Sequence, residues 1–154
     1  MTRADVKPLL AIVPARGGSQ GIRGKNLRPL KGKPLILHTL ETLADVAEID
    51  RVVVSTDSLE IGSFARVRGY EYLPRDQSLA MPDTTLSEVA IAIVRQLAWD
   101  GEVGVFQPTS PFRTSQSVRS AIREFRESGC ASLSSAVRER HLFWLDEGEG
   151  DLNH

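Results

Sequence analysis

A glycine-rich segment with three cations lies near the N-terminus, between Arg16 and Lys25. It contains four glycines and the side chains of Arg16, Arg23 and Lys25. Glycine adopts positive φ at little cost, so several backbone N–H groups can turn toward one point and surround phosphate oxygens. Arginine grips such oxygens with a planar fork, and lysine adds a mobile point charge. The segment therefore favours a triphosphate-binding loop, with a solvated surface loop as the alternative.

The segment departs from both standard phosphate-binding motifs. A P-loop has the pattern G-x-x-x-x-G-K-[ST], but here Ser19 occupies the first glycine position and Asn26 the hydroxyl position. The dinucleotide fingerprint G-x-G-x-x-G also fails, because Gly17 and Gly18 are adjacent. We expect a loop that covers a nucleotide rather than a tight turn into a helix.

Two further polar segments follow apolar runs. Residues 55–57 (Ser-Thr-Asp) end one run, and residues 107–111 (Gln-Pro-Thr-Ser-Pro) end another. Ligands of parallel sheets bind beyond the carboxyl ends of the strands. These two segments and the glycine-rich loop are therefore predicted to converge on one site.

Short β-branched runs alternate with amphipathic helical patterns along the chain. We expect helices from Pro34, over 58–67, from about Thr85 and over 114–128, and strands at 9–13, 51–55, 70–73, 103–106 and 131–137. The run at 9–13 is continuously apolar, as in a strand covered on both faces. This order predicts a three-layer α/β domain with a mainly parallel sheet, with residues 1–154 as a single domain.

The composition excludes several classes of protein. Nineteen basic and 20 acidic residues give a formal net charge of −1, which excludes a strongly basic nucleic-acid-binding protein. Cys130 is the only cysteine, so an internal disulfide is impossible; we expect it to be a small buried residue in a cytoplasmic protein. No apolar run approaches the length of a membrane span. We therefore expect neither nucleic acid nor membrane as a partner.

Residues 12–26 resemble the nucleotide-binding loop of the acylneuraminate cytidylyltransferases, which are the CMP-sialic acid synthetases and the related enzymes for legionaminic and pseudaminic acids. The resemblance spans about residues 9–145 and includes further motifs in the family's order: residues 51–57, Arg75, Asp83-Thr84, residues 107–113 and residues 141–144.

The resemblance implies a nucleotide-diphospho-sugar transferase-like fold, usually dimeric. It implies a reaction of CTP with a nine-carbon α-keto acid sugar to give a CMP-sugar and pyrophosphate, with Mg²⁺ neutralising charge. By matching positions, it implies catalytic roles for Arg16, Lys25 and Gln107, sugar binding by Gln107 and Arg113, and nucleotide binding by Arg16, Gly17, Gly18, Ser19, Lys25, Asn26, Arg75 and Ser87. Such chemistry depends on alignment and on positive charge around the phosphate oxygens.

Two departures from the family pattern leave alternatives open. The family commonly has a cation where this chain has Gln20. Family members also continue past position 154, into a segment with a dimerisation arm, sugar contacts and a metal-binding Asp-x-Asp pair. The metal ligands therefore stay unknown, and we expect a domain without that segment. A nucleotide-binding domain without complete catalysis, or a nucleotidyltransferase for another sugar, is the alternative.

Several polar residues have a simpler structural interpretation. Asp57, at the end of a strand, could touch a ligand or the metal. Asp57 and Ser58 also both suit the N-cap of the helix at 58–67, and we favour a cap for Asp57. Asp83 and Thr84 suit either a cap or the site. We expect His38 to lie on the surface of the first helix.

Overall fold

A four-stranded parallel sheet forms the centre of the computed structural model, which describes residues 6–18, 21–81 and 83–136. The strand order is β5–β4–β1–β6, with β1 at Leu9–Pro14, β4 at Arg51–Thr56, β5 at Glu71–Pro74 and β6 at Glu102–Val105. The pairings β1–β4, β1–β6 and β4–β5 are all parallel. Residues 9–13 of β1 are buried, which explains their continuously apolar sequence.

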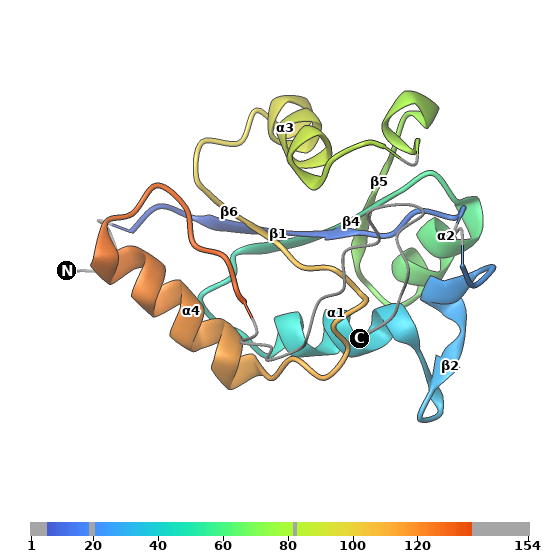
Figure 1. Cartoon of the computed structure of the whole chain (residues 1–154), viewed down its shortest axis with the longest axis horizontal. Helices are drawn as coiled ribbons and strands as arrows, with labels where there is room; N and C mark the ends of the chain where they lie inside the picture. The colour runs from blue at the N-terminus through green and yellow to red at the C-terminus, as the bar shows by residue number, and fades with distance from the viewer. Residues whose placement is uncertain (1–5, 19–20, 82, 137–154) are drawn as a thin grey trace, which may run out of the picture.

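Helices cover both faces of this sheet (Figure 1). Helices α1 (Leu35–Ala44), α2 (Leu59–Val67) and α4 (Ser115–Ser128) lie on one face, and α3 (Leu86–Leu97) lies on the other. Alternate residues of the strands pack into the two cores: Val54 faces α1, α2 and α4, whereas Val53 faces α3. The predicted three-layer α/β architecture with a parallel sheet is therefore confirmed.

A small hairpin precedes α1. Its strands are β2 (Pro29–Leu30) and β3 (Lys33–Pro34), and its turn places Lys31 and Gly32 at φ of 48° and 81°. The helix predicted from Pro34 begins one residue later, because Pro34 pairs in β3 and serves as the N-cap. Sequence patterns missed this hairpin, since each strand has only two residues.

The helix ends carry the signals that the sequence predicts. Thr85 and Glu88 form a full capping box at the start of α3: the Thr85 hydroxyl accepts from the Glu88 N–H at 3.2 Å, and the Glu88 carboxylate accepts from the Thr85 N–H at 2.7 Å. Gly129 ends α4 in the left-handed conformation, with φ of 63°. Two short 3₁₀ helices, η2 (Lys25–Leu27) and η3 (Gln77–Leu79), lie in the connecting loops.

Two predictions about the C-terminal part are wrong. Residues 131–136 form no strand and are exposed, and residue 137 lies outside the described residues. Leu133 is the only large apolar side chain there and is 43% exposed, so this segment has no apolar face to bury. Cys130 is half-buried rather than buried, and it accepts a hydrogen bond from the Ser128 hydroxyl at 3.0 Å. No helix within the described residues is long and apolar enough to span a membrane.

An ion pair ties the edge strand β5 to β4. Arg51 donates from Nε to Glu71 Oε2 at 2.8 Å and from Nη2 to Oε1 at 2.6 Å. These hydrogen bonds hold the pKa of Glu71 below its ordinary value, although partial burial acts in the opposite direction.

Replacing Glu71 with Gln should therefore destabilise the protein in a pH-dependent way. A depressed folded-state pKa adds stability above the unfolded-state pKa, and this stability is lost as the pH falls through the folded-state value. We expect Glu71→Gln to cost less than about 1 kcal/mol at neutral pH, because the pair is partly exposed. Chemical denaturation should show the variant and the wild type converging near pH ~3. An unchanged gap at that pH would contradict the assignment.

Candidate nucleotide-binding site

A cavity of about 280 Å³ lies at the carboxyl edge of the sheet. Three segments far apart in sequence meet there, because the strands are parallel and end at the same edge. The first segment begins at the last residue of β1, the second runs from the end of β5 into α3, and the third follows β6. In this order, the lining residues are Pro14, Arg16, Lys25 and Asn26, then Arg75, Leu79, Met81, Thr84, Leu86 and Val89, then Gln107, Pro108 and Thr109. The structure thus brings together the glycine-rich loop and the segment after β6.

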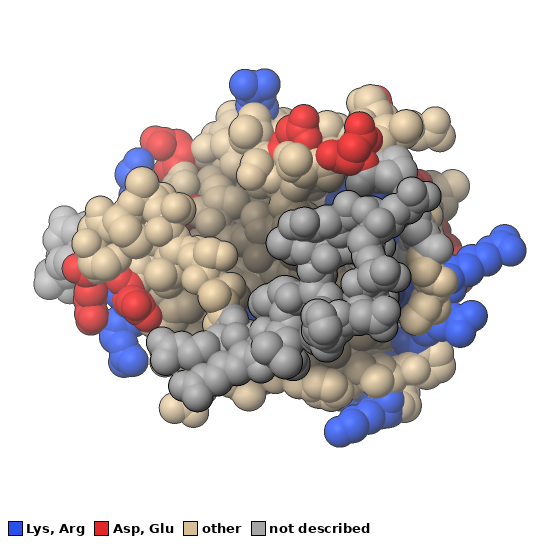
Figure 2. All heavy atoms as spheres, in the orientation of Figure 1, with Lys and Arg blue, Asp and Glu red and all other residues tan. Residues whose placement is uncertain are grey.

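The walls of the cavity differ in chemistry. Arg16, Lys25 and Arg75 supply positive charge, and none of the described lining residues carries a carboxylate. The side formed by η3 and α3 is apolar. On the face shown in Figure 2, Lys and Arg side chains project around the end that holds the β2–β3 hairpin and α2; near α3, Asp and Glu side chains lie beside a further Lys or Arg side chain. An anion with a flat or apolar portion suits such walls.

Arg75 is fixed in place by β4. Its Nη2 donates to the Ser55 carbonyl at 2.8 Å, and its Nε donates to the Ser55 hydroxyl at 3.2 Å. Burial is the main cause that lowers the pKa of Arg75; nearby Asp57 opposes this shift and Arg16 adds to it. Two guanidinium groups that repel each other therefore face one cavity, and an anionic ligand would relieve that repulsion.

The start of the glycine-rich loop is anchored from two sides. The side-chain amide of Asn26, which is buried, donates to the Arg16 carbonyl at 3.0 Å. The Gly17 N–H donates to Asp57 Oδ1 at 2.8 Å. The predicted cap role of Asp57 is wrong, because Ser58 is the N-cap of α2 and its hydroxyl accepts from the Ile61 N–H at 3.4 Å.

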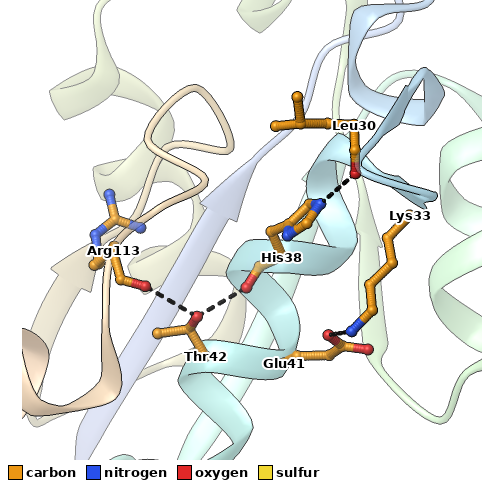
Figure 3. A network of polar contacts seen from close by, with 6 residues as sticks. All are labelled: Leu30, Lys33, His38, Glu41, Thr42 and Arg113. Atoms are coloured by element: carbon orange, nitrogen blue, oxygen red, sulfur yellow. Dashed lines mark hydrogen bonds and ion pairs between the residues drawn. The ribbon is translucent and has the colours of Figure 1, made fainter.

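The segment after β6 is anchored to α1, as Figure 3 shows. The Thr42 hydroxyl lies 3.2 Å from the Arg113 carbonyl and 2.9 Å from the His38 carbonyl. His38 is half-buried rather than a plain surface residue, and its Nε2 lies 2.8 Å from the Leu30 carbonyl. The contact with Arg113 thus holds the end of the segment 107–113, whose first residue, Gln107, lines the cavity.

The chain matches the cytidylyltransferase family over residues 10–143. It belongs to that family. It is 36% identical over 119 residues to the N-acylneuraminate cytidylyltransferase of Escherichia coli O18:K1:H7, covering 77% of this chain and 28% of that enzyme. It is also 36% identical over 135 residues to the CMP-N,N'-diacetyllegionaminic acid synthase of Legionella pneumophila, covering 82% of this chain and 56% of that enzyme. The chain thus spans only part of the length of these relatives.

Solved structures share the fold of this chain. A CMP:2-keto-3-deoxy-manno-octonic acid synthetase complexed with CTP matches with a TM-score of 0.70 at 21% identity, over 79% of this chain and 48% of that one. A cytidylyltransferase from Leptospira borgpetersenii matches with a TM-score of 0.63 at 17% identity, over 79% and 50% of the two chains.

The residues predicted for the site fall into three groups. Those that line the cavity are Arg16, Lys25, Asn26, Arg75 and Gln107. Gly17, Gly18, Ser87 and Arg113 are described but do not line it, and Ser19 lies outside the described residues. Ser87 is exposed on the first turn of α3.

Arg113 does not line the cavity. Its guanidinium is 5.4 Å from the centre of the Phe106 ring. Its buried Nη1 atom has no hydrogen-bond partner within the described part of the chain. Burial lowers the pKa of Arg113.

The apolar wall is the part of the site that sequence reasoning missed. Leu79, Met81, Leu86 and Val89 give no motif, because single apolar residues in a loop and on a helix resemble ordinary core positions. Thr84, for which cap and site were both open, lines the cavity, and Thr85 is the cap.

The magnesium that the resemblance implies has no ligand set in the described residues. Within residues 6–18, 21–81 and 83–136, no three His, Cys, Asp or Glu side chains lie close enough to hold a metal ion. The cations of the cavity also make this part of the wall a poor metal site by itself.

Gly17 lies where a larger residue does not fit. A Cβ atom at this position would lie 2.9 Å from the Cβ atom of Ser58, whereas a Cβ atom at Gly18 would meet nothing within 4 Å. We expect Gly17→Ala to reduce the free energy of unfolding by about 1–3 kcal/mol, because backbone must shift. Gly18→Ala is the matched control and should cost no stability. Equal losses in chemical denaturation would contradict the close approach of the loop to α2.

Proposed function

We propose that this chain is the nucleotide-binding part of an enzyme that transfers CMP from CTP to a nine-carbon α-keto acid sugar, of the sialic, legionaminic or pseudaminic acid type, and releases pyrophosphate. The observation that carries the proposal is a cavity with three cations and no carboxylate among its described lining residues, at the carboxyl edge of a parallel sheet. The names of the two relatives, N-acylneuraminate cytidylyltransferase and CMP-N,N'-diacetyllegionaminic acid synthase, support the sugar class.

The chemistry assigned to the cavity is a single displacement at phosphorus. The anomeric hydroxyl of the sugar forms a bond to the α-phosphorus of CTP and loses its proton, and the bond to the β-phosphate oxygen breaks as pyrophosphate leaves. Arg16 and Lys25 stabilise the negative charge on the phosphate oxygens. Gln107 binds and orients the sugar, because its amide both donates and accepts hydrogen bonds. Catalysis by these residues is alignment and charge stabilisation.

The other residues assigned to the nucleotide are chosen by their place in the glycine-rich loop or in the cavity. Gly18 and Ser19 are assigned to phosphate binding only from the resemblance of the loop, since glycine-rich backbone suits phosphate oxygens, whereas the Gly17 N–H is already bonded to Asp57. Asn26 and Arg75 line the same cavity. The apolar wall on η3 and α3 provides contact for the face of the cytosine ring.

Two assigned residues lie outside the cavity. Ser87, on the first turn of α3, is proposed for the cytosine side of the nucleotide. Arg113 is proposed for the sugar carboxylate, since its buried Nη1 has no partner among the described residues.

Three finer features complete the proposal. The enzyme uses Mg²⁺, whose protein ligands lie outside the described lining residues, and it works as a homodimer. The single cysteine agrees with a reducing cytoplasm.

Nucleotide binding is tested by titration calorimetry with CTP, ATP, GTP and UTP in the presence of Mg²⁺. We expect CTP to bind selectively, and Arg16→Ala and Lys25→Ala to weaken CTP binding about tenfold to a hundredfold, since each loses a charge-assisted hydrogen bond. Arg123→Ala is the matched control, because Arg123 is exposed on α4 and does not line the cavity. Equal binding of all four nucleotides, or losses no larger than that of the control, would refute the assignment.

Catalysis is tested by pyrophosphate release from CTP with candidate sugar acids. We expect release with a nine-carbon α-keto acid sugar and a lower kcat/KM with an eight-carbon one. Gln107→Ala should raise KM for the sugar and leave the affinity for CTP within about twofold, because Gln107 is assigned to the sugar. Selective CTP binding without pyrophosphate release would instead favour the alternative, a nucleotide-binding domain that needs a further segment or chain for catalysis. The observation behind that alternative is that the chain spans 28% and 56% of the two relatives.

A further inference from the structure

Asp57 makes a long-range hydrogen bond that plays no part in capping α2. It is exposed and follows β4 directly, next to the N-cap residue Ser58. Its Oδ1 accepts from the Gly17 N–H at 2.8 Å, across 40 positions of sequence. Because Ser58 provides the cap, the Asp57 carboxylate is available to the glycine-rich loop.

The hydrogen bonds of Asp57 and Asn26 hold the same peptide group, the one between Arg16 and Gly17. The carbonyl of Arg16 accepts from Asn26 Nδ2 at 3.0 Å, and the N–H of Gly17 donates to Asp57 at 2.8 Å. The Arg16 carbonyl and the Gly17 N–H belong to the same planar peptide unit. Holding both of its ends fixes the orientation of that plane, and with it the direction in which the loop leaves the sheet.

The close approach of the loop to α2 makes the contact possible. The backbone at Gly17 passes so near Ser58 that an added Cβ atom would lie 2.9 Å from the Ser58 Cβ atom. A glycine at this position therefore lets the loop reach the Asp57 side chain.

Asp57 also offsets positive charge at the cavity, although it is not one of the described residues that line it. It attracts Arg75, whereas Arg16 repels Arg75, so the carboxylate offsets part of the repulsion between the two guanidinium groups. Asp57 is not among the cavity-lining residues, and so it presents no carboxylate to incoming phosphates.

We propose that Asp57 is a positioning residue: together with Asn26 it fixes the Arg16–Gly17 peptide, so that the Arg16 side chain is held ready to bind phosphate oxygens. This inference rests on the proposed function only in taking the ligand to be a phosphate anion. A displacement of a binding group by a fraction of an ångström is enough to weaken a preorganised site.

The test measures binding of CTP and of inorganic triphosphate, together with thermal stability. We expect Asp57→Ala to weaken both ligands about three- to tenfold, because a hydrogen bond that positions Arg16 is lost. Asp57→Asn keeps an acceptor at the same position and should restore most of the affinity. Ser58→Ala is the matched control: it removes the cap of α2, lowers the melting temperature and leaves both affinities unchanged.

A double-mutant cycle identifies the residue through which Asp57 acts. If Asp57 positions Arg16, then Asp57→Ala should have little further effect on binding in the Arg16→Ala background. Additive losses would overturn the inference, as would an Asp57→Ala variant that binds triphosphate like the wild type. Should Asp57→Ala fail to fold, Asp57→Glu replaces it, since it keeps the charge but carries the carboxylate one methylene further from the backbone, and it should weaken both ligands.

The two ligands separate this inference from the proposed function. A wild-type protein that binds triphosphate but does not prefer CTP would contradict the proposed function, and the effect of Asp57→Ala on triphosphate binding would still decide the role of Asp57. A wild-type protein that binds neither ligand would overturn both.

Discussion

Burial of β1 on both faces is the constraint on which the rest of the structure depends. Residues 9–13 sit at the centre of the sheet, between β4 and β6, and their side chains alternate between the two cores. Helices must cover both faces of such a strand, and parallel neighbours need crossover helices to reach it. The carboxyl ends of β1, β4 and β6 then lie at one edge. This arrangement brings the glycine-rich loop and the segment that carries Gln107 to one cavity.

The second constraint is electrostatic. Arg16, Lys25 and Arg75 face one cavity without a carboxylate among the described lining residues. Repulsion between such groups disfavours the empty site, and it also strengthens attraction for an anion. The protein limits this repulsion indirectly: the Ser55 carbonyl and hydroxyl accept from the Arg75 guanidinium, and Asp57 lies close enough to attract it. The residues that hold the Arg75 guanidinium in place, Ser55 and Asp57, are not among the described residues that line the cavity.

Elements with a local sequence signal could be predicted from the sequence, whereas features that depend on tertiary contacts could not. The buried run of β1, the capping box of Thr85 and the glycine end of α4 are local signals, and all appear in the structure. The β2–β3 hairpin was missed because its strands are too short to show a period. The strand expected at 131–137 does not form over 131–136, where Leu133 is the only large apolar residue. The cationic wall could be predicted from residue types and motif order, whereas the apolar wall on η3 and α3 could not.

Asp57 and Ser58 illustrate why the site is harder to predict than the fold. Both residues suit a helix N-cap, so local preference does not assign one to the helix and the other to the loop. The assignment follows from a contact 40 positions away: Gly17 has no side chain, its backbone comes close to Ser58, and its N–H meets the Asp57 carboxylate. Ser58 caps α2, and Asp57 holds the peptide that follows Arg16. A glycine at position 17 thus does more than allow a flexible loop, because its small size decides which of two adjacent polar residues holds the loop to the sheet.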